Sequence, residues 1–426
     1  MKVNLRKVAI IGGSRIPFCR SHTQYKSAAN QDMLTAAIAG VVHRFNLRGE
    51  TLGDVASGAV LKHSKDWNLA RESVLGSGLH ANTPAFDIQR ACGTSLEAAI
   101  LVGSKIALGQ INSGLAAGTD TVSDAPIVYP KEYRAVLMDI FRSRSVTDRA
   151  KAALGFRPSH LKPETPSVNE PRTGLSMGES TELMARQWNI SREDQDALAL
   201  ASHQKAAAAY DSGFFSDLVV PFRGVSTDNN LRRDSSMESL GKLRPAFDKK
   251  SGHGTLTAGN STPLTDGAAA VLLASEQWAQ DRDLPVQAYL THGRVAAVDF
   301  IESEGLLMAP AYAVSEMLKA ANLSLQDFDF YEIHEAFAAQ VLCTLRAWES
   351  ERFCREKLGR DEAMGSIDPN KLNVNGSSLA VGHPFAATGA RILATTAKLL
   401  EQKGSGRALI SICTAGGMGV TAIVER

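Results

Sequence analysis

The chain has 426 residues, of which 44% are apolar and 21% are charged. This length suffices for two or three domain-sized units with a sizeable buried core. Its 46 lysines and arginines nearly balance its 45 aspartates and glutamates, so the composition argues against a nucleic-acid-binding protein, which typically has a strongly basic surface.

The five cysteines are odd in number, scattered and without a CxxC pair: Cys19, Cys92, Cys343, Cys354 and Cys413. Their pattern argues against a disulfide framework and a zinc knuckle, and it favours a reducing, cytoplasmic location. The first residues lack the apolar core of a secretion signal, and the last three residues resemble no peroxisomal address. No apolar run is long enough to predict a transmembrane helix.

The first part of the chain alternates strands with helices. Strand-like runs at 7–11, 55–60 and 114–118 accompany helical windows at 31–45 and 94–108. This alternation is typical of an α/β fold with a largely buried sheet.

The stretch 123–256 has recurrent prolines and polar turns in place of the regular alternation. One long helix should begin after Ser191, because its hydroxyl can cap the helix and the acidic residues that follow suit the first turn. We interpret this stretch as a large insertion that covers one face of the core.

The regular alternation of strands and helices returns at 267–274 and continues to the end of the chain. The predicted elements are strands at 328–333, 408–413 and 419–425, and helices at 334–348 and 389–400. Both series combine an apolar strand, a glycine-bounded corner and an alanine-rich helix, which indicates a duplicated α/β core.

Cys92 lies at a corner between an extended apolar run and an alanine-rich helix. The N–H groups and dipole at a helix start favour a thiolate over a thiol. A thiolate at such a corner suits nucleophilic acyl transfer. The alternative is a small buried hydrophobe, the usual role of a free cysteine.

Two further corners suit the same chemistry. His383 lies between Gly382 and Pro384, so it should project from a rigid turn, where an imidazole can activate a thiol. Cys413 ends an apolar strand before a glycine-rich turn, whose N–H groups can bind an oxyanion, and a second thiol there can donate a proton. The alternatives are a histidine hydrogen-bonded within its loop and a buried strand-end cysteine.

His334 stands where a predicted strand gives way to a helix. An HExxH zinc site would need a second histidine at the position of Ala338, so no metal is expected. A neutral imidazole that donates to an acyl oxygen is one role for His334, and a capping histidine is the other.

These four corners together resemble the thiolase family. Cys92 stands where the family has its acylated nucleophile, and Gly382-His383-Pro384 matches the family's GHP motif. Cys413 with Gly416-Gly417-Met418-Gly419 matches its terminal cysteine–glycine motif. The segments Ala258-Gly259-Asn260-Ser261 and Asp266-Gly267-Ala268-Ala269-Ala270 are also similar to the family, and the likeness runs from Val8 to Val424.

Within the family, the chain resembles thiolases of the fatty-acid-oxidation β-subunit type. His334-Glu335-Ala336-Phe337 stands where the commonest pattern has Asn-Glu-Ala-Phe, and the insert at 129–163 resembles that branch too. Ser176 occupies a position where many short-chain thiolases carry histidine, which argues against an acetoacetyl-specific pocket.

The resemblance implies a duplicated five-layered α-β-α-β-α core with an inserted loop domain. Residues 1–123 with 262–284 would form the N-terminal half, 124–261 the inserted loop domain over the CoA site, and 285–426 the C-terminal half. At least a homodimer is implied, with a homotetramer as the other possibility.

The resemblance also implies acyl transfer between thioesters, with acyl-CoA and CoA as substrates and no cofactor. His383 would deprotonate Cys92, Cys92 would attack a 3-oxoacyl-CoA, and Cys413 would protonate the released enolate. His334 with His383 would donate to the enolate oxygen. The acyl oxyanion would be held by the Cys92 N–H and the Cys413–Gly417 turn, with Ala415, Gly416 and Gly417. CoA would be held by Met177, Phe247, Ala258, Gly259, Thr262 and Phe337.

Other functions stay open at this point. They are a biosynthetic acetoacetyl-CoA thiolase, a noncatalytic acyl-CoA- or lipid-binding protein, and a carrier-protein-dependent condensing enzyme. Retention of Cys92, His383 and Cys413 argues against the noncatalytic protein, and the condensing enzyme would normally lack the cysteine at 413.

The segment 131–162 has eight basic and three acidic residues, with apolar residues between them. A solvated basic face is the usual meaning of such a run. The sharper hypothesis is docking to an acidic partner such as a β-oxidation α-subunit, to the CoA phosphates or to a membrane surface.

Overall fold

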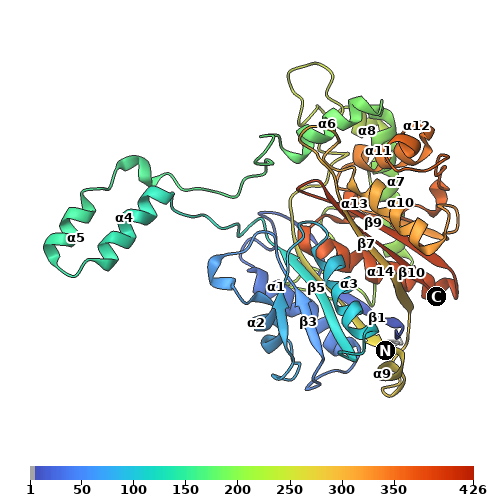
Figure 1. Ribbon diagram of the computed structural model, residues 1–426, viewed down its shortest axis with the longest axis horizontal. Helices are drawn as coiled ribbons and strands as arrows, with labels where there is room; N and C mark the ends of the chain where they lie inside the picture. Colours follow the sequence, from blue (N-terminus) through green and yellow to red (C-terminus); the bar gives the residue numbers. More distant parts are fainter. Residues whose placement is uncertain (1–4) are drawn as a thin grey trace.

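The computed structural model describes residues 5–426 (Figure 1), so the first four residues of the predicted N-terminal half lie outside it. Its main strands form one sheet in the order β4-β3-β5-β6-β1-β7-β10-β9-β8. One half of the sheet contains β1 (Val8–Arg15), β3 (Asp54–Ser57), β4 (Ala85–Asp87), β5 (Ser113–Asp120) and β6 (Thr265–Ser275). The other contains β7 (Ala288–Ala297), β8 (Phe330–Ile333), β9 (Arg407–Thr414) and β10 (Met418–Glu425).

The two halves of the sheet repeat one topology. β3 is parallel to β5, β5 is antiparallel to β6, and β6 is antiparallel to β1. In the same way β8 is parallel to β9, β9 is antiparallel to β10, and β10 is antiparallel to β7. The halves join through only two residue pairs between β1 and β7, Ala9–Tyr289 and Ile10–Ala288. The repeated order of strands supports the predicted duplication.

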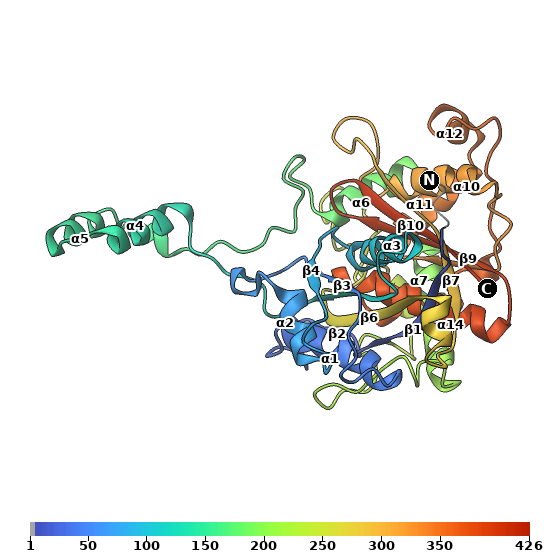
Figure 2. The same ribbon diagram turned by 60° about the horizontal axis from the view of Figure 1, so that its bottom comes forward.

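Helices form three layers around the two half-sheets (Figures 1 and 2). α3 (Thr94–Ala107) and α14 (Thr388–Lys403) share one apolar cluster with strands of both halves and form the middle layer. α1 (Asn30–Arg44) and α2 (Leu69–Gly76) cover the other face of the first half, while α10 (Ala309–Ala321) and α11 (Ala338–Glu349) cover that of the second. The predicted five-layered α-β-α-β-α core is confirmed.

α3 and α14 approach each other closely at Gly389. A Cβ at this glycine would lie 2.3 Å from the backbone nitrogen of Leu96, so no larger residue fits without a shift of one helix. This contact matters for the site, because α3 follows Cys92 and α14 follows His383 in the chain.

The insertion contains α4 (Lys131–Arg142), α5 (Val146–Ala153), α6 (Met177–Gln187), α7 (Arg192–Asp211) and α8 (Met237–Gly241). α7 begins as predicted, with the Ser191 hydroxyl accepting from the Asp194 N–H at 3.0 Å. α6 and α7 pack against α11, but neither α4 nor α5 has a buried residue, and both project far from the body (Figure 2). The expectation that the insertion covers one face of the core is therefore correct only for its later part.

The remaining short elements are β2 (Cys19–Arg20), α9 (Glu276–Gln280), α12 (Glu351–Glu356) and α13 (Ser378–Val381). One predicted boundary is wrong where it affects the site: the helix expected from His334 begins at Ala338. Among residues 5–426, no helix combines the length and the apolar character needed to cross a membrane.

Candidate active site

Cys92 occupies a strained corner between β4 and α3. Ala91 just before it has a φ of 42°, which is unusual for a residue other than glycine. Thr94 holds the corner closed, because its hydroxyl donates to the Ala91 carbonyl at 2.7 Å and accepts from the Arg90 N–H at 2.8 Å. The side chain of Cys92 is thereby fixed at the sheet end, with only 9% of its surface exposed.

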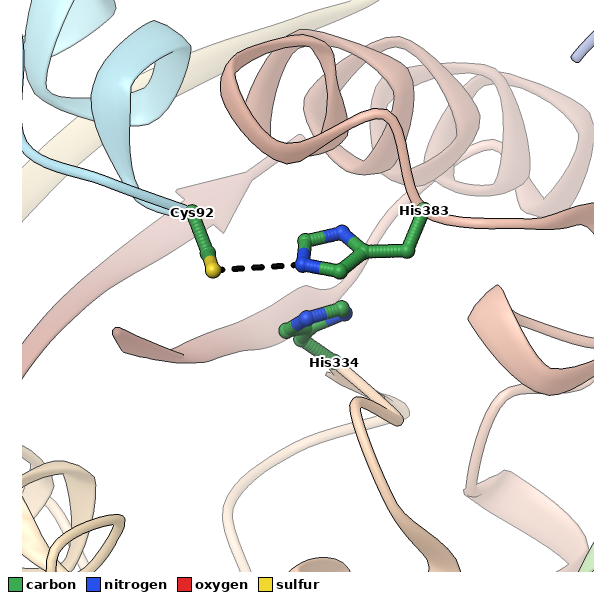
Figure 3. Close-up of side chains that lie close together, drawn as sticks. All are labelled: Cys92, His334 and His383. Atoms are coloured by element: carbon green, nitrogen blue, oxygen red, sulfur yellow. Dashed lines mark hydrogen bonds between the residues drawn. The ribbon is translucent and has the colours of Figure 1, made fainter. Parts of the chain in front are cut away.

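His383 faces Cys92 from the opposite half of the molecule (Figure 3). Its Nε2 lies 3.1 Å from the Cys92 sulfur, while its Nδ1 lies 2.6 Å from the hydroxyl oxygen of Thr388. Gly382 has a φ of 102°, and a Cβ there would lie 2.8 Å from a Thr265 methyl carbon, so glycine is required before His383. The rigid turn predicted for His383 is present, and it delivers an imidazole to the thiol.

Both members of this pair are neutral at pH 7. Burial raises the pKa of the Cys92 thiol to about 12, although the N–H groups of Ala415 and Cys92 itself partly oppose the effect. Burial, with a smaller contribution from Arg391, lowers the pKa of His383 to about 3. Loss of water outweighs the backbone donors at the helix start that were expected to favour the thiolate, so Cys92 rests as a thiol. The thiolate must be generated during attack, with His383 as the base.

His334 lies beside His383, with ring centroids 4.2 Å apart (Figure 3). Its Nδ1 is 2.8 Å from the Ser378 hydroxyl oxygen, and its buried Nε2 has no hydrogen-bond partner in the described chain. Burial lowers the pKa of His334, with smaller contributions from His383 when it is protonated and from Arg391, so its imidazole is neutral. The free nitrogen can donate to, or accept from, a bound molecule.

One donor atom from each of Cys92, His334 and His383 lies within 4.8 Å of the others. Thiolate and imidazole are ligands that zinc accepts, so this cluster could also hold a metal ion. The absence of a metal remains a prediction, which elemental analysis of the purified protein would check.

Cys413 and the turn after it complete the cluster. Cys413 is the penultimate residue of β9 and is 1% exposed. Burial and the negative charge of an ionised Cys92 raise its pKa well above the usual value. It is therefore a protonated thiol close to Cys92. The N–H of Ala415 reaches the Cys92 sulfur, whereas the N–H of Gly416 already donates to the Glu170 carboxylate at 2.7 Å.

Ala415 and Gly416 of the predicted oxyanion turn therefore differ in what their N–H groups contact. Ala415 offers an N–H near the position of an acyl oxygen on Cys92, and the N–H of Cys92 approaches the same sulfur. Two such donors are the usual composition of an oxyanion hole. The assignment of Gly416 to this role needs correction, because its N–H is occupied by Glu170.

The residues predicted to bind CoA form two neighbouring groups. Phe247 and Phe337 pack edge to face at 5.7 Å, and Met177 belongs to the same apolar cluster. Thr262 joins them through its N–H and hydroxyl, which both donate to the Ala336 carbonyl at 3.1 Å.

The second group lines a cavity of about 250 Å³ in the insertion. Ala258 and Gly259 contribute to its wall, together with Arg20, His203 and Arg232. Sequence reasoning missed the two arginines and His203, which is neutral at pH 7 because burial and the charges of Arg232 and Arg20 lower its pKa to about 4. The only local signal was the Arg232-Arg233 pair.

Thr388, Ser378 and Arg391 were also missed by sequence reasoning. Thr388 contacts His383, while Ser378 contacts His334 and accepts from Arg391 at 2.6 Å. A hydroxyl in the otherwise apolar Ser378-Leu379-Ala380-Val381 turn was the only available signal for Ser378.

The chain matches two family descriptions in tandem: "Thiolase, N-terminal domain" over residues 8–277 and "Thiolase, C-terminal domain" over residues 284–426. The chain belongs to the thiolase family. Among curated thiolases it is 41% identical over 425 residues to the 3-ketoacyl-CoA thiolase of Yersinia enterocolitica, covering 98% of this chain and 97% of that protein.

Solved thiolase structures agree along the whole chain. Human mitochondrial 3-ketoacyl-CoA thiolase superposes with a TM-score of 0.81 at 30% identity, with 99% of each chain covered. The acetyl-CoA acetyltransferase of Bacillus anthracis gives 0.82 at 29% identity, with 100% of each covered. The human enzyme has also been solved in complex with CoA.

Proposed function

We propose that this thiolase is an acetyl-CoA C-acyltransferase, which cleaves 3-oxoacyl-CoA with CoA to give acetyl-CoA and an acyl-CoA shortened by two carbons. The observation that carries the proposal is the Cys92–His383 pair at 3.1 Å, with the Ala415 N–H at the same sulfur and the Cys413 thiol near enough to respond to its charge. The 41% identity to a protein named 3-ketoacyl-CoA thiolase supports this substrate class and a place in fatty-acid β-oxidation.

The first half-reaction begins at the neutral pair. His383 Nε2 accepts the Cys92 proton while the sulfur attacks the 3-keto carbon of the substrate. The bond between carbons 2 and 3 then breaks, leaving an acyl group on Cys92 and an acetyl-CoA enolate. Cys413 gives its proton to the enolate carbon, while His334 supports the enolate oxygen.

The second half-reaction restores the starting protonation states of Cys92, His383 and Cys413. The Cys413 thiolate takes the proton of an incoming CoA thiol, and the CoA sulfur attacks the acyl group on Cys92. The N–H groups of Cys92 and Ala415 hold the oxyanion that forms. As the Cys92 sulfur leaves, His383 returns its proton. Each step is reversible, so the same site also supports Claisen condensation.

Mass spectrometry after brief exposure to 3-oxoacyl-CoAs of several lengths tests this function. We expect an acyl adduct on the peptide containing Cys92, and none on that peptide in Cys92→Ser. An adduct confined to another cysteine would contradict the assignment. The rank of kcat/KM with chain length separates degradative activity from the biosynthetic alternative, because an acetoacetyl-CoA thiolase would prefer the four-carbon substrate.

One observation bears on that alternative. The hydroxyl of Ser176 accepts from the Glu179 N–H at 3.2 Å and caps α6, so it is engaged in starting the helix that carries Met177. A serine in this capping role leaves the position without the histidine found in many short-chain thiolases, which argues against an acetoacetyl-specific pocket.

The basic cavity beside Ala258 is proposed to receive the phosphates of CoA. Arg232→Gln should raise KM for CoA about tenfold with kcat unchanged, because losing one contact to a charged group costs about 1.5 kcal/mol or more. Arg233→Gln is the matched control: this neighbour pairs with Asp211 at 2.9 Å and lies outside the cavity lining. Equal effects of the two changes would place the phosphates elsewhere.

We further propose that the arm, residues 129–163, docks on an acidic surface of a membrane or of a β-oxidation α-subunit. Phe141, Val146 and Leu154 are each more than 80% exposed among the basic residues of this hairpin. Apolar and basic side chains together suit an anionic interface. Figure 1 shows the arm held away from the body, where such contact leaves the site open.

Cosedimentation with vesicles and pull-down with an α-subunit test the arm. Replacing Arg134, Arg142 and Arg149 with glutamine should reduce binding to anionic vesicles or to the α-subunit at least severalfold, while thiolysis of a soluble substrate is kept. Vesicles of neutral lipid serve as the control. Unchanged binding by the triple variant would remove this role.

The quaternary structure is proposed to be a homodimer or homotetramer. β4 ends the sheet with β3 as its only partner in residues 5–426, and an open edge of this kind can pair with another chain. Light scattering tests the oligomer, and cell fractionation tests the proposed cytoplasmic location.

A further inference from the structure

The hydrogen bonds behind His334 define which of its nitrogens carries the proton. Ser378 is fully buried at the start of α13, and its hydroxyl oxygen lies between two groups. One is Nη2 of Arg391 at 2.6 Å, and the other is Nδ1 of His334 at 2.8 Å.

The proton count at this oxygen selects one arrangement, because only that one gives the Ser378 hydrogen an acceptor in the described chain. A guanidinium nitrogen only donates, so Ser378 accepts from Arg391. The hydroxyl has a single hydrogen, and His334 Nδ1 is the acceptor within reach in the described chain. Ser378 therefore donates to Nδ1, and the imidazole hydrogen of neutral His334 is left on Nε2.

We propose that Ser378, oriented by Arg391, is a positioning residue that fixes His334 in the tautomer with its N–H directed into the active site. The inference rests on the proposed function. It assigns His334 as a donor to the enolate oxygen of the acetyl-CoA half of the substrate. The unpartnered Nε2 in the free protein is the place that this oxygen would take.

The opposite tautomer would direct a lone pair at the negative oxygen. Removal of one donor from such a site commonly lowers the rate by about 10² to 10³. Loss of the Ser378 hydroxyl keeps the imidazole but removes the selection between tautomers, so a smaller effect, tenfold or more, is expected on steps that form the enolate. Acylation of Cys92 by a simple acyl-CoA forms no enolate and should not depend on Ser378.

Two half-reactions of acetyl-CoA separate these effects: deuterium uptake from D₂O into its methyl group, and acetylation of Cys92. In Ser378→Ala we expect kcat for deuterium uptake to fall at least tenfold at unchanged KM, with Cys92 acetylation within twofold of wild type. Ser378→Thr should restore most of the rate. Ser378→Cys replaces the hydroxyl with a slightly larger thiol that donates only weakly, and its rate should fall between those of the other two variants.

Ser377→Ala is the matched control. Its hydroxyl accepts from the same Arg391 at 3.1 Å but makes no contact with His334 in the described structure. We expect less than a threefold change in either half-reaction. The inference is overturned if Ser378→Ala leaves deuterium uptake intact, or if it lowers both half-reactions equally. Failure of the wild-type protein to acetylate Cys92 would instead overturn the proposed function, and this inference with it.

Discussion

Replacing His383 with glutamine should lower the rate of Cys92 acylation by a factor of about 10² to 10⁴, the usual contribution of a general base. The thiol has a pKa of about 12, so very little thiolate exists at pH 7 without a base in place. Glutamine retains a hydrogen-bonding group of similar reach but cannot accept the proton. Quenched-flow measurement of acetyl transfer from acetyl-CoA to Cys92 checks this loss of rate. No CoA thiol has to be deprotonated before that step, so its titration does not complicate the measurement.

His383→Gln should change the shape of the pH–rate profile for acetylation of Cys92 as well as the magnitude of the rate. In the wild-type protein neither group titrates between pH 6 and 9, since the pKa of His383 is about 3 and that of Cys92 about 12, so the rate should be nearly flat. In His383→Gln the rate should rise tenfold for each pH unit, because hydroxide must then supply the thiolate. His43→Gln, on an exposed position of α1, should match wild type. A wild-type rate that rises in the same way would contradict the role of His383.

The sequence was sufficient for features that local geometry decides. His383 lies in a corner fixed by Gly382 and Pro384, and Cys92 lies at the turn into an alanine-rich helix. The structure has both corners. The repeated series of strands and helices also indicated the duplicated core. The predictions for Cys92 and His383 succeeded because each depends on residues within one short segment, and the duplication was found because its pattern occurs twice.

Features decided by packing between distant segments were not predictable. The protonation state of Cys92 depends on burial by both halves of the fold, which outweighs the helix start. The helix after His334 begins late because Glu335 accepts from Ser202, Asn373 and the Leu379 N–H at 2.7 to 3.2 Å, which holds the backbone outside the helix. Ser378 and Glu170 reach their partners across 44 and 246 residues, and no spacing rule finds such contacts.

Cys413→Ala should separate the two half-reactions most sharply. A group whose pKa is raised well above its usual value stays protonated throughout the physiological range, so Cys413 can give a proton but cannot compete with Cys92 as the resting nucleophile. Removing it should lower deuterium uptake into acetyl-CoA by about 10² or more, the scale of general acid–base catalysis. Acetylation of Cys92 should stay within a few-fold of wild type, because the proton that Cys413 gives in that step goes to the departing CoA thiolate, a far weaker base than the enolate carbon, and water can protonate it instead.

Cys354→Ala controls for loss of a buried thiol, because Cys354 hydrogen-bonds to the Ala347 and Trp348 carbonyls far from this chemistry in the sequence. It should leave both half-reactions unchanged. If Cys413→Ala instead abolished acetylation of Cys92 and spared deuterium uptake, the two thiols would have exchanged roles. The two thiols have different roles because of charge. His383 contacts the sulfur of Cys92, and an ionised Cys92 makes ionisation of Cys413 still less favourable. Only one of the two thiols can therefore carry the negative charge at a time.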